Sequence, residues 1–417
     1  MDRMEKGGAT RRLLLGAAPV ALATPALAQQ RQPQGRGQPQ RPQPQRQQTQ
    51  APRPQGSPAN TPLGPLDTLA RHALIVDFET GATLLEKDAD IPMPPASMSK
   101  LMTAYVVFEK LREGRLRMDT ELPVSERAWR MGGSKMFVEV GQTVRVDDLL
   151  RGVIVQSGND ACVVLAEAIS GSEEAFAEMM TERARALGLT STTLRNATGW
   201  PDPNHRMSCR DLAVLSARII HDFPEYYRIY SEKSFRFANI SQENRNPLLY
   251  RNVGADGLKT GHTEESGYGL TGSAVQGGRR VIMVVNGLPS MRVRGEESER
   301  LIGWAFREFE NIRLFGPAET VEEVPVYLGE RATVPLVAGR DLVMTVPRNW
   351  RTGAQIAVRY ASPVKAPVAR GMELGRLEVS GRGVPDMTVP LYAGADVPRL
   401  GFVPRIGASL RHLVFGS

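Results

Sequence analysis

The sequence has few of the residues that build metal centres and disulfide frameworks. Among 417 residues there are two cysteines, Cys162 and Cys209, and five scattered histidines. No Cys-x-x-Cys or His-Glu-x-x-His pattern occurs, so we expect neither a metal site nor a cofactor. Both cysteines fall in segments predicted to be helical, which implies no disulfide framework, and Cys162 is expected to be a buried, small apolar side chain.

The apolar run near the N-terminus is too short to be a permanent membrane span. Arg11-Arg12 precede this run, Leu13 to Leu22, and Ala26 to Ala28 supply the small residues of a cleavage site. Residues 1–28 are therefore predicted to be a signal peptide, and the mature protein is expected in the periplasm. The segment Thr10 to Leu15 also resembles a twin-arginine signal, so the export route stays open between that pathway and the general one.

Acidic residues are absent from residues 29–64, the segment after the predicted signal peptide. Residues 29–64 are mostly Gln, Pro and Arg, and such a composition cannot bury enough apolar surface to fold, which predicts a disordered linker. The linker carries five arginines, and the signal peptide carries four bases and two acids. These tails account for the whole net charge of +7, so the folded remainder is near neutral and we expect no nucleic-acid partner.

Residues 65–318 are predicted to form one domain, with strands at both ends of its sequence and helices between them. A single antiparallel sheet built from the two ends, with helices packed on it, fits this order and predicts an α/β fold of the α+β kind. The predicted strands form two hairpins: Leu74–Asp77 with Thr83–Glu86, and Gly267–Val275 with Arg280–Gly287. The predicted helices are Ser97 to about Leu111, Val146–Val155, Ala161–Ile169, one opening at Ser172, Asp211–His221 and Glu296–Glu310.

The C-terminal quarter of the sequence has a different composition. From about Val321, strand-like runs alternate with Gly and Pro turns and no helical period is visible, which predicts a small all-β sandwich at 319–396. In the last segment, 397–417, apolar residues recur at helical spacing, which favours an amphipathic tail that contacts the outer face of the inner membrane. The alternative is a C-terminal helix that docks on the β-domain. The apolar positions are Phe402, Ile406, Leu410 and Leu413.

Three short motifs carry the chemistry. Ser97 and Lys100 stand three residues apart at the start of a predicted helix and so share one face, which suits a serine nucleophile whose proton is taken by a neutral lysine. Ser157-Gly158-Asn159 and Lys259-Thr260-Gly261 follow in order. Together the three match the S-x-x-K, S-D-N and K-T-G signature of penicillin-binding proteins and class A β-lactamases, except that the middle motif reads S-G-N.

Longer segments extend this match. The chain resembles the low-molecular-mass penicillin-binding proteins that act as serine-type D-alanyl-D-alanine carboxypeptidases, over roughly residues 66–395. This resemblance implies a β-lactamase/transpeptidase-like catalytic domain followed by a β-sandwich. The segments that carry it, beyond the motifs, are Pro95–Lys110, Ser157–Cys162, Asp211–Leu215, Gln242–Asn246 and Asp256–Ala274.

Roles can be assigned for a peptide that ends in D-Ala-D-Ala. Ser97 would attack the penultimate carbonyl, and Lys100, desolvated and beside cationic Lys259, would have a lowered pKa and act as base. Ser157 would relay the proton to the leaving D-alanine, and Asn159 would hold Lys100 or the substrate amide.

The resemblance also implies an oxyanion hole made of the backbone N–H groups of Ser97 and His262. Lys259 and Thr260 would hold the terminal carboxylate. Arg294, just before the last helix, matches the family's carboxylate-binding arginine, and Arg245 matches a second substrate-side arginine. The expected partners are peptidoglycan stem peptides and, as covalent inhibitors, β-lactam antibiotics. The expected substrate-binding residues are Lys259, Thr260, Gly261, His262, Arg294 and Arg245.

Three alternatives remain at this point. A β-lactamase shares the motifs, but Thr192 to Asp211 contains no glutamate that could drive deacylation. An endopeptidase acting on cross-linked peptides would need the same site with more room. A wall-binding protein with a dead site is the third, and the intact motifs argue against it.

Overall fold

The computed structural model describes residues 57–401. The predicted signal peptide, residues 29–56 of the predicted linker and residues 402–417 of the predicted tail lie outside the described residues.

An antiparallel sheet of five strands organises the first domain. Its two ends come from distant parts of the sequence, as predicted, because the β3–β4 hairpin joins the β10–β11 hairpin through β3 and β11. Gly277 and Gly278 form the tight turn between β10 and β11, with φ of 56° and 81°. In spatial order the strands are β4 (Thr83–Lys87), β3 (His72–Asp77), β11 (Arg279–Leu288), β10 (Gly267–Gln276) and β9 (Ala255–Thr263).

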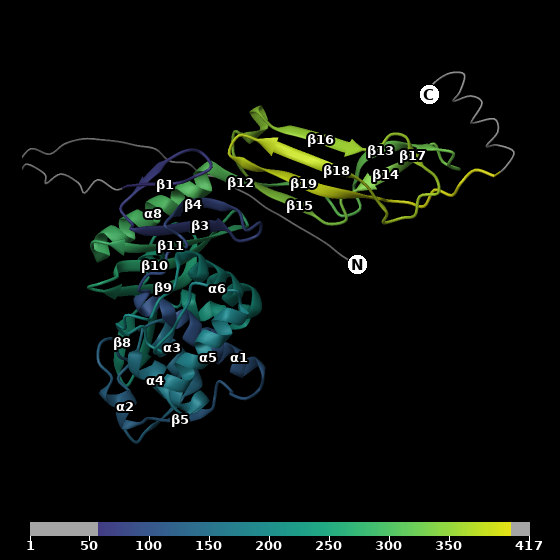
Figure 1. The fold of residues 1–417 in the computed structure, drawn as a ribbon. Coiled ribbons are helices and arrows are strands. Elements are labelled where there is room, and N and C mark those ends of the chain that lie inside the picture. Colours follow the sequence, from purple (N-terminus) through teal and green to yellow (C-terminus); the bar gives the residue numbers. More distant parts are fainter. Residues whose placement is uncertain (1–56, 402–417) are drawn as a thin grey trace, which may run out of the picture. The chain divides into compact units, whose positions relative to one another are not determined.

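The two faces of this sheet bury different cores. Helix α8 (Met291–Glu308) covers one face, where Ile75, Val285 and Ile302 are buried. The other face packs against α6 (Cys209–Asp222) and the remaining helices (Figure 1). The alternation of strand side chains between two buried faces explains why these strands are almost continuously apolar.

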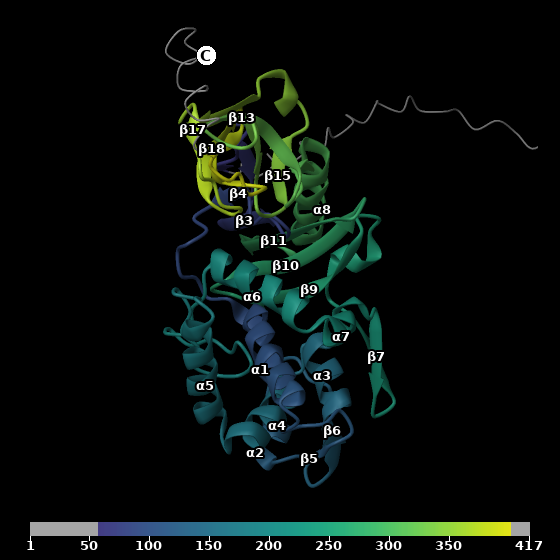
Figure 2. The same ribbon diagram turned by 90° about the vertical axis from the view of Figure 1, so that its right-hand side faces the viewer.

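Helix α1 (Lys100–Arg112) runs through the middle of the helical layer (Figure 2). Every residue from Lys100 to Glu109 is buried, because other helices surround it. Its neighbours are α3 (Val146–Ile154), α4 (Asn159–Ser170), α5 (Glu173–Ala186) and α6.

Short elements complete the first domain. They comprise small hairpins at its periphery and single helical turns between the larger elements. Their bounds are β1 (Ser57–Ala59), β2 (Leu66–Thr68), η1 (Ala96–Ser99), β5 (Glu121–Pro123), α2 (Glu126–Arg130), β6 (Thr143–Arg145), α7 (Pro224–Tyr227), η2 (Arg228–Ser231), β7 (Ser234–Phe237), β8 (Ile240–Glu243) and η3 (Pro247–Tyr250).

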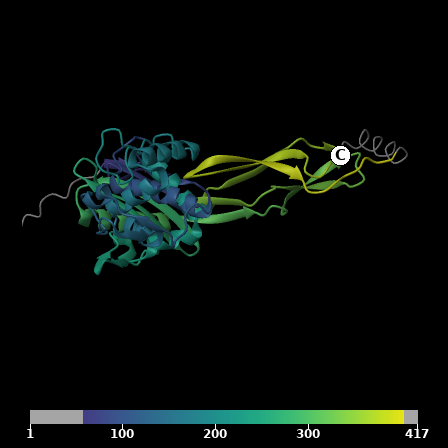
Figure 3. The ribbon, with the colours of Figure 1, turned by 90° about the horizontal axis from the view of Figure 1, so that it is seen from below.

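The C-terminal domain is all-β, as predicted, with long twisted strands (Figure 3). A six-stranded sheet and a two-stranded sheet enclose one core that includes Val324, Leu377 and Leu391. The first sheet has the order β16 (Gln355–Tyr360), β18 (Glu373–Gly381), β19 (Val384–Ala393), β14 (Thr333–Val337), β13 (Thr320–Tyr327) and β17 (Val364–Lys365). The second pairs β12 (Phe309–Phe315) with β15 (Leu342–Pro347), and a short turn η4 (Trp350–Thr352) follows β15.

Three boundaries differ from the sequence-based expectation. The linker ends earlier than residue 64, because β1 pairs with β2 and buries Ala59. The β-domain begins earlier than 319, because β12 pairs with β15. The tail begins later than 397, because Val397 is fully buried in the β-domain core. In each case a change in amino-acid composition indicated that a boundary lay nearby, but the contacts of strands and buried side chains within the fold determined its position.

Candidate active site

Ser97 and Lys100 are brought together by a change of helix type. Ser97 lies in the 3-10 turn η1, and Lys100 is the first residue of α1. Residues three apart eclipse each other in a 3-10 turn, which aligns the two side chains. The Lys100 Nζ lies 2.9 Å from the Ser97 Oγ, as the spacing predicted. Ser97 is half-buried, so a substrate can reach it, whereas Lys100 is only 1% exposed.

The amine of Lys100 sits among three oxygens. Besides Ser97, it contacts the Asn159 Oδ1 at 2.7 Å and the carbonyl of Thr198. Burial, and to a smaller extent the positive charge of Arg245, lower the pKa of Lys100 to about 8. Burial is the main cause, as expected, and burial together with the charge of Lys100 also lowers the pKa of Lys259.

The second motif forms the turn into α4. Asn159 is the first residue of α4, and its Nδ2 donates to the Gly132 carbonyl at 2.8 Å, which turns its Oδ1 toward Lys100. Ser157 is 3% exposed and adopts a φ of 61°, an uncommon left-handed conformation for serine. Within residues 57–401 the Ser157 hydroxyl has no hydrogen-bond partner, so it is free to bond a substrate.

Asp160 is a buried residue of this site that sequence reasoning missed. Its carboxylate accepts the backbone N–H groups of Met136, Phe137 and Val138 at 2.9, 2.8 and 3.2 Å. It thereby fixes the loop whose Ser134 carbonyl accepts the N–H of Asn159 at 2.7 Å. An acid in the first turn of a helix is common, so the sequence offered no signal for this role.

The third motif lies on β9 at the sheet edge. Lys259 is 3% exposed, and burial together with the charges of Lys100 and Arg245 lowers its pKa. Gly261 faces η1: a Cβ there would stand 2.7 Å from the Pro95 carbonyl oxygen, so only glycine lets β9 pack so close to the turn that carries Ser97. The exposed ring of His262 stacks on Tyr268, with 3.9 Å between ring centroids.

Arg294 is a buried cation without a counter-ion. It lies in the first turn of α8, not before the helix as expected, because Ser290 caps α8 five residues earlier than predicted. Arg294 is 3% exposed, and its Nη2 donates to the Arg245 carbonyl at 3.3 Å. Its Nε is buried and has no partner among the residues that the structure describes. Burial lowers its pKa to about 10, so it stays charged at neutral pH.

The site therefore collects positive charge. Arg245 is exposed, and its guanidinium donates to the Ser134 hydroxyl. In the part of the chain that the structure describes, no carboxylate forms an ion pair with Lys100, Lys259, Arg245 or Arg294. Since an unpaired buried cation is costly, this arrangement is built for an anionic ligand group beside the nucleophile.

The loop of residues 196–205 closes one side of the site. Its Thr198 carbonyl accepts from Lys100, and Gly199 passes directly beneath Ala96. The loop contains no glutamate, but Glu173 of α5 reaches it and accepts the Ala197 N–H at 3.0 Å. His205 braces the loop by accepting the Arg195 N–H at 3.1 Å.

The two cysteines take no part in the site. Cys162 and Cys209 are both free and fully buried, as expected for small apolar side chains. Burial raises the pKa of Cys162 to about 12, which keeps it a neutral thiol.

Comparison with known proteins gives one consistent family. A family model described as D-alanyl-D-alanine carboxypeptidase matches residues 58–290, and one described as the C-terminal domain of penicillin-binding protein 5 matches residues 309–399. The D-alanyl-D-alanine carboxypeptidase DacC of Escherichia coli is 38% identical over 345 residues, which is 81% of this chain and 86% of that protein.

Solved structures agree with this relation. Penicillin-binding protein 5 from Haemophilus influenzae is 37% identical and superposes with a TM-score of 0.71 over 80% of this chain and 99% of that one. Penicillin-binding protein D2 from Listeria monocytogenes, solved in its ampicillin-bound form, is 32% identical with a TM-score of 0.53 over 58% of this chain and 98% of that one. The chain therefore belongs to the D-alanyl-D-alanine carboxypeptidase family of penicillin-binding serine peptidases.

Proposed function

We propose that this enzyme removes the terminal D-alanine from peptidoglycan stem pentapeptides through an acyl-enzyme on Ser97, and that β-lactams acylate the same serine. The observation that carries the proposal is the contact between Ser97 and the buried amine of Lys100, beside cations that have no carboxylate of their own. A C-terminal carboxylate on the substrate would supply the missing charge.

The three contacts of Lys100 fit a general base. A neutral amine has two protons and one lone pair. If it donates to the Asn159 Oδ1 and the Thr198 carbonyl, its lone pair is left facing the Ser97 hydroxyl, which then donates to it. The neighbours of Lys100 thus hold the amine in the orientation that accepts the serine proton.

Acylation and deacylation follow from this orientation. The Ser97 proton passes to Lys100 while Oγ bonds to the carbonyl carbon of the penultimate D-alanine, and the N–H groups of Ser97 and His262 stabilise the oxyanion. The C–N bond then breaks, and the leaving amine takes a proton through Ser157. Water adds to the ester, and cleavage of the ester bond restores the Ser97 hydroxyl and releases the shortened peptide.

The carboxylate of the substrate would bind among Lys259, Thr260, Arg294 and Arg245. The unpartnered Nε of Arg294 and its lack of an ion pair support this assignment. A bound carboxylate would favour the charged form of Lys259 and raise its depressed pKa. Substrate binding would thus balance the positive charge of the site.

A carboxypeptidase fits better than a β-lactamase. A fast β-lactamase needs a free carboxylate beside the acyl-enzyme, and the loop of residues 196–205 has no glutamate. Glu173, which reaches this loop, is already engaged by Arg127 at 2.8 Å and by the Ala197 N–H. An endopeptidase would use the same residues. A non-catalytic wall-binding role gives no reason to keep Lys100 in contact with Ser97.

The function is tested by covalent labelling and product analysis. Wild-type protein is expected to retain a fluorescent penicillin, whereas Ser97→Ala is expected to retain none, because the ester cannot form. The wild type is also expected to release D-alanine from a pentapeptide faster than it hydrolyses penicillin. Absence of wild-type labelling, or equal labelling of Ser97→Ala, would contradict the enzyme assignment, and faster penicillin hydrolysis would indicate a β-lactamase.

We also propose that the exported enzyme works in the periplasm, attached by its tail to the outer face of the inner membrane. The described residues contain no helix that is both long and apolar enough to cross a bilayer. The support comes from the signal-like N-terminus and the apolar spacing of Phe402, Ile406, Leu410 and Leu413. Deletion of 402–417 should move the protein from the membrane fraction to the soluble fraction with unchanged penicillin labelling. Unchanged fractionation would overturn the tail assignment.

A further inference from the structure

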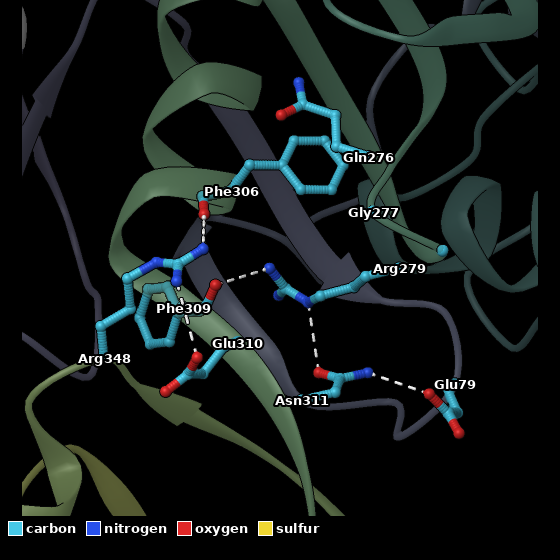
Figure 4. A pocket seen from close by; sticks show the side chains of 10 residues that line it. Glu79, Gln276, Gly277, Arg279, Phe306, Phe309, Glu310, Asn311 and Arg348 are labelled. Atoms are coloured by element: carbon cyan, nitrogen blue, oxygen red, sulfur yellow. Dashed lines mark hydrogen bonds and ion pairs between the residues drawn. The ribbon is translucent and has the colours of Figure 1, made fainter.

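A second cleft lies away from the catalytic residues, around Arg279 (Figure 4). Its volume is about 580 Å³. Gln276 on its rim is five residues along β10 from Thr271, the partner of Lys259, so the two sites are about 17 Å apart along the strand at ~3.3 Å per residue. The lining residues are Glu79, Gln276, Gly277, Gly278, Arg279, Phe306, Phe309, Glu310, Asn311 and Arg348.

One nitrogen of the Arg279 guanidinium lacks a hydrogen-bond acceptor among the described residues. The Arg279 side chain is only 9% exposed and pairs with the buried Asp77 at 2.8 Å. Its Nη1 donates to the carbonyls of Ala305 and Phe309 at 3.1 and 3.0 Å, which ties the end of α8 to the sheet. Its Nη2 is buried and has no hydrogen-bond partner within residues 57–401. An unsatisfied buried donor costs about 1–3 kcal/mol, so an acceptor oxygen placed here would be stabilised.

The charges around the cleft do not favour an anionic ligand. The carboxylates of Asp77, Glu79 and Glu310 outnumber the guanidinium groups of Arg279 and Arg348, which enter the cleft from opposite sides in Figure 4. The carboxylates of exposed Glu79 and half-buried Glu310 accept hydrogen bonds, whereas the Arg279 Nη2 donates one. A neutral ligand that both donates and accepts hydrogen bonds suits this lining.

Asn311 offers nothing to such a ligand. Its amide donates to Asp77 and Glu79 at 3.2 and 3.1 Å, and its oxygen accepts from Arg279 and Thr345 at 3.2 and 2.9 Å. Asn311 instead holds the walls of the cleft in place. In the part of the chain that the structure describes, the Arg279 Nη2, the Glu79 Oε1 and the Glu310 Oε1 have no hydrogen-bond or ion-pair partner, whereas the Glu310 Oε2 pairs with Arg348 at 3.5 Å.

We infer that this cleft binds an N-acetylated sugar unit of the glycan strand. The acetamido carbonyl would accept from the Arg279 Nη2, and sugar O–H and amide N–H groups would donate to Glu79 and Glu310. A Cβ on Gly277 or Gly278 would meet no atom within 4 Å, so the rim is open there, and Phe306 adds an apolar wall for the C–H face of a sugar ring. The volume suits a disaccharide, since small-molecule sites span about 300–1,000 Å³.

Such a site would hold the polymer while a stem peptide reaches Ser97. One part of the inference rests on the proposed function: that the sugar belongs to peptidoglycan. An enzyme that cleaves stem peptides necessarily encounters the glycan strand to which those peptides are attached. Recognition of the sugar itself depends on residues that take no part in catalysis.

The test is a direct binding titration on the full Ser97→Ala chain. We expect saturable binding of N,N′-diacetylchitobiose and of glycan strands cleared of stem peptides, and weaker binding of cellobiose, which lacks the acetamido group. Adding Glu79→Ala and Glu310→Ala should weaken diacetylchitobiose binding at least tenfold, about 1.4 kcal/mol, because both donor-accepting carboxylates are lost.

A matched control lies on the same strand as Glu310. Arg313 also forms a surface ion pair, with Asp341 at 2.7 Å, but lies outside the cleft, so Arg313→Ala should bind as the parent does. In a Ser97 background, penicillin labelling should be unchanged by the cleft substitutions, which separates this site from the proposed function. No saturable binding, equal binding of cellobiose, or equal affinity of the double variant would overturn the inference.

Discussion

Replacement of Lys100 by arginine is expected to reduce acylation by penicillin by a factor on the order of 10²–10⁴, the usual contribution of a general base. Arginine keeps the positive charge at every accessible pH, so it cannot take the proton of Ser97. Stopped-flow measurement of penicillin acylation provides the test. Thermal unfolding should show that the variant still folds, and a neutral Lys100→Met variant covers the case in which the larger guanidinium disturbs packing.

Lys110→Arg is the matched control for this substitution. Lys110 lies near the C-terminal end of α1, at the opposite end of the helix from Lys100, and pairs with Glu113 at 3.0 Å. It should acylate as the wild type does. Normal acylation by Lys100→Arg would show that another group takes the serine proton, even though the family assignment would stand.

The same assignment fixes the pH dependence of the wild type. The reactive form of Lys100 is the neutral amine, and its pKa is about 8, so about a tenth is neutral at pH 7. Acylation should therefore rise with pH through about 8 and level off above it. A rate that is flat or falls across this range would contradict a role for Lys100 as base.

Gly199→Ala is expected to impair acylation on the order of 10²-fold, the usual result of a displacement of about 1 Å in an active site. The new Cβ would stand 2.1 Å from the carbonyl oxygen of Ala96 and 2.9 Å from the N–H nitrogen of Ser97. Both are backbone atoms, so either the turn that carries Ser97 or the loop that carries Thr198 must move. Each movement separates the nucleophile from its base.

The strain of an alanine in the left-handed backbone conformation is not expected to reduce acylation by itself. Gly188→Ala tests this, because it introduces the same strain without a collision. Gly188 has a φ of 81°, close to the 77° of Gly199, but a Cβ there meets no atom within 4 Å. Both substitutions pay about 1–2 kcal/mol for the left-handed conformation, and only Gly199→Ala adds the collision. Acylation should fall strongly in Gly199→Ala, whereas Gly188→Ala should acylate at nearly the wild-type rate. Similar rates would show that the close approach is unimportant for catalysis.

Local sequence patterns predicted most of the elements of the fold. The hairpins were marked by alternating apolar residues around Gly turns, and the helices by caps such as Ser172, which accepts the Ala175 N–H at 3.1 Å. The start of α8 was missed because Ser290 is followed by polar and charged residues that hide the helical period. The complete burial of α1 was missed because periodicity cannot say how many neighbours a helix will have.

The sequence by itself determined the reaction class. The S-x-x-K motif needs only one helical turn to bring Ser97 to Lys100, and the other two motifs identified further polar residues of the catalytic site. Only the tertiary structure decided the electrostatics. The depressed pKa of Lys100, the unpaired charge of Arg294 and the bracing of the site by Asp160 all depend on burial and on contacts between residues far apart in the chain. Desolvation is a property of the packed fold, so no local pattern could have revealed it.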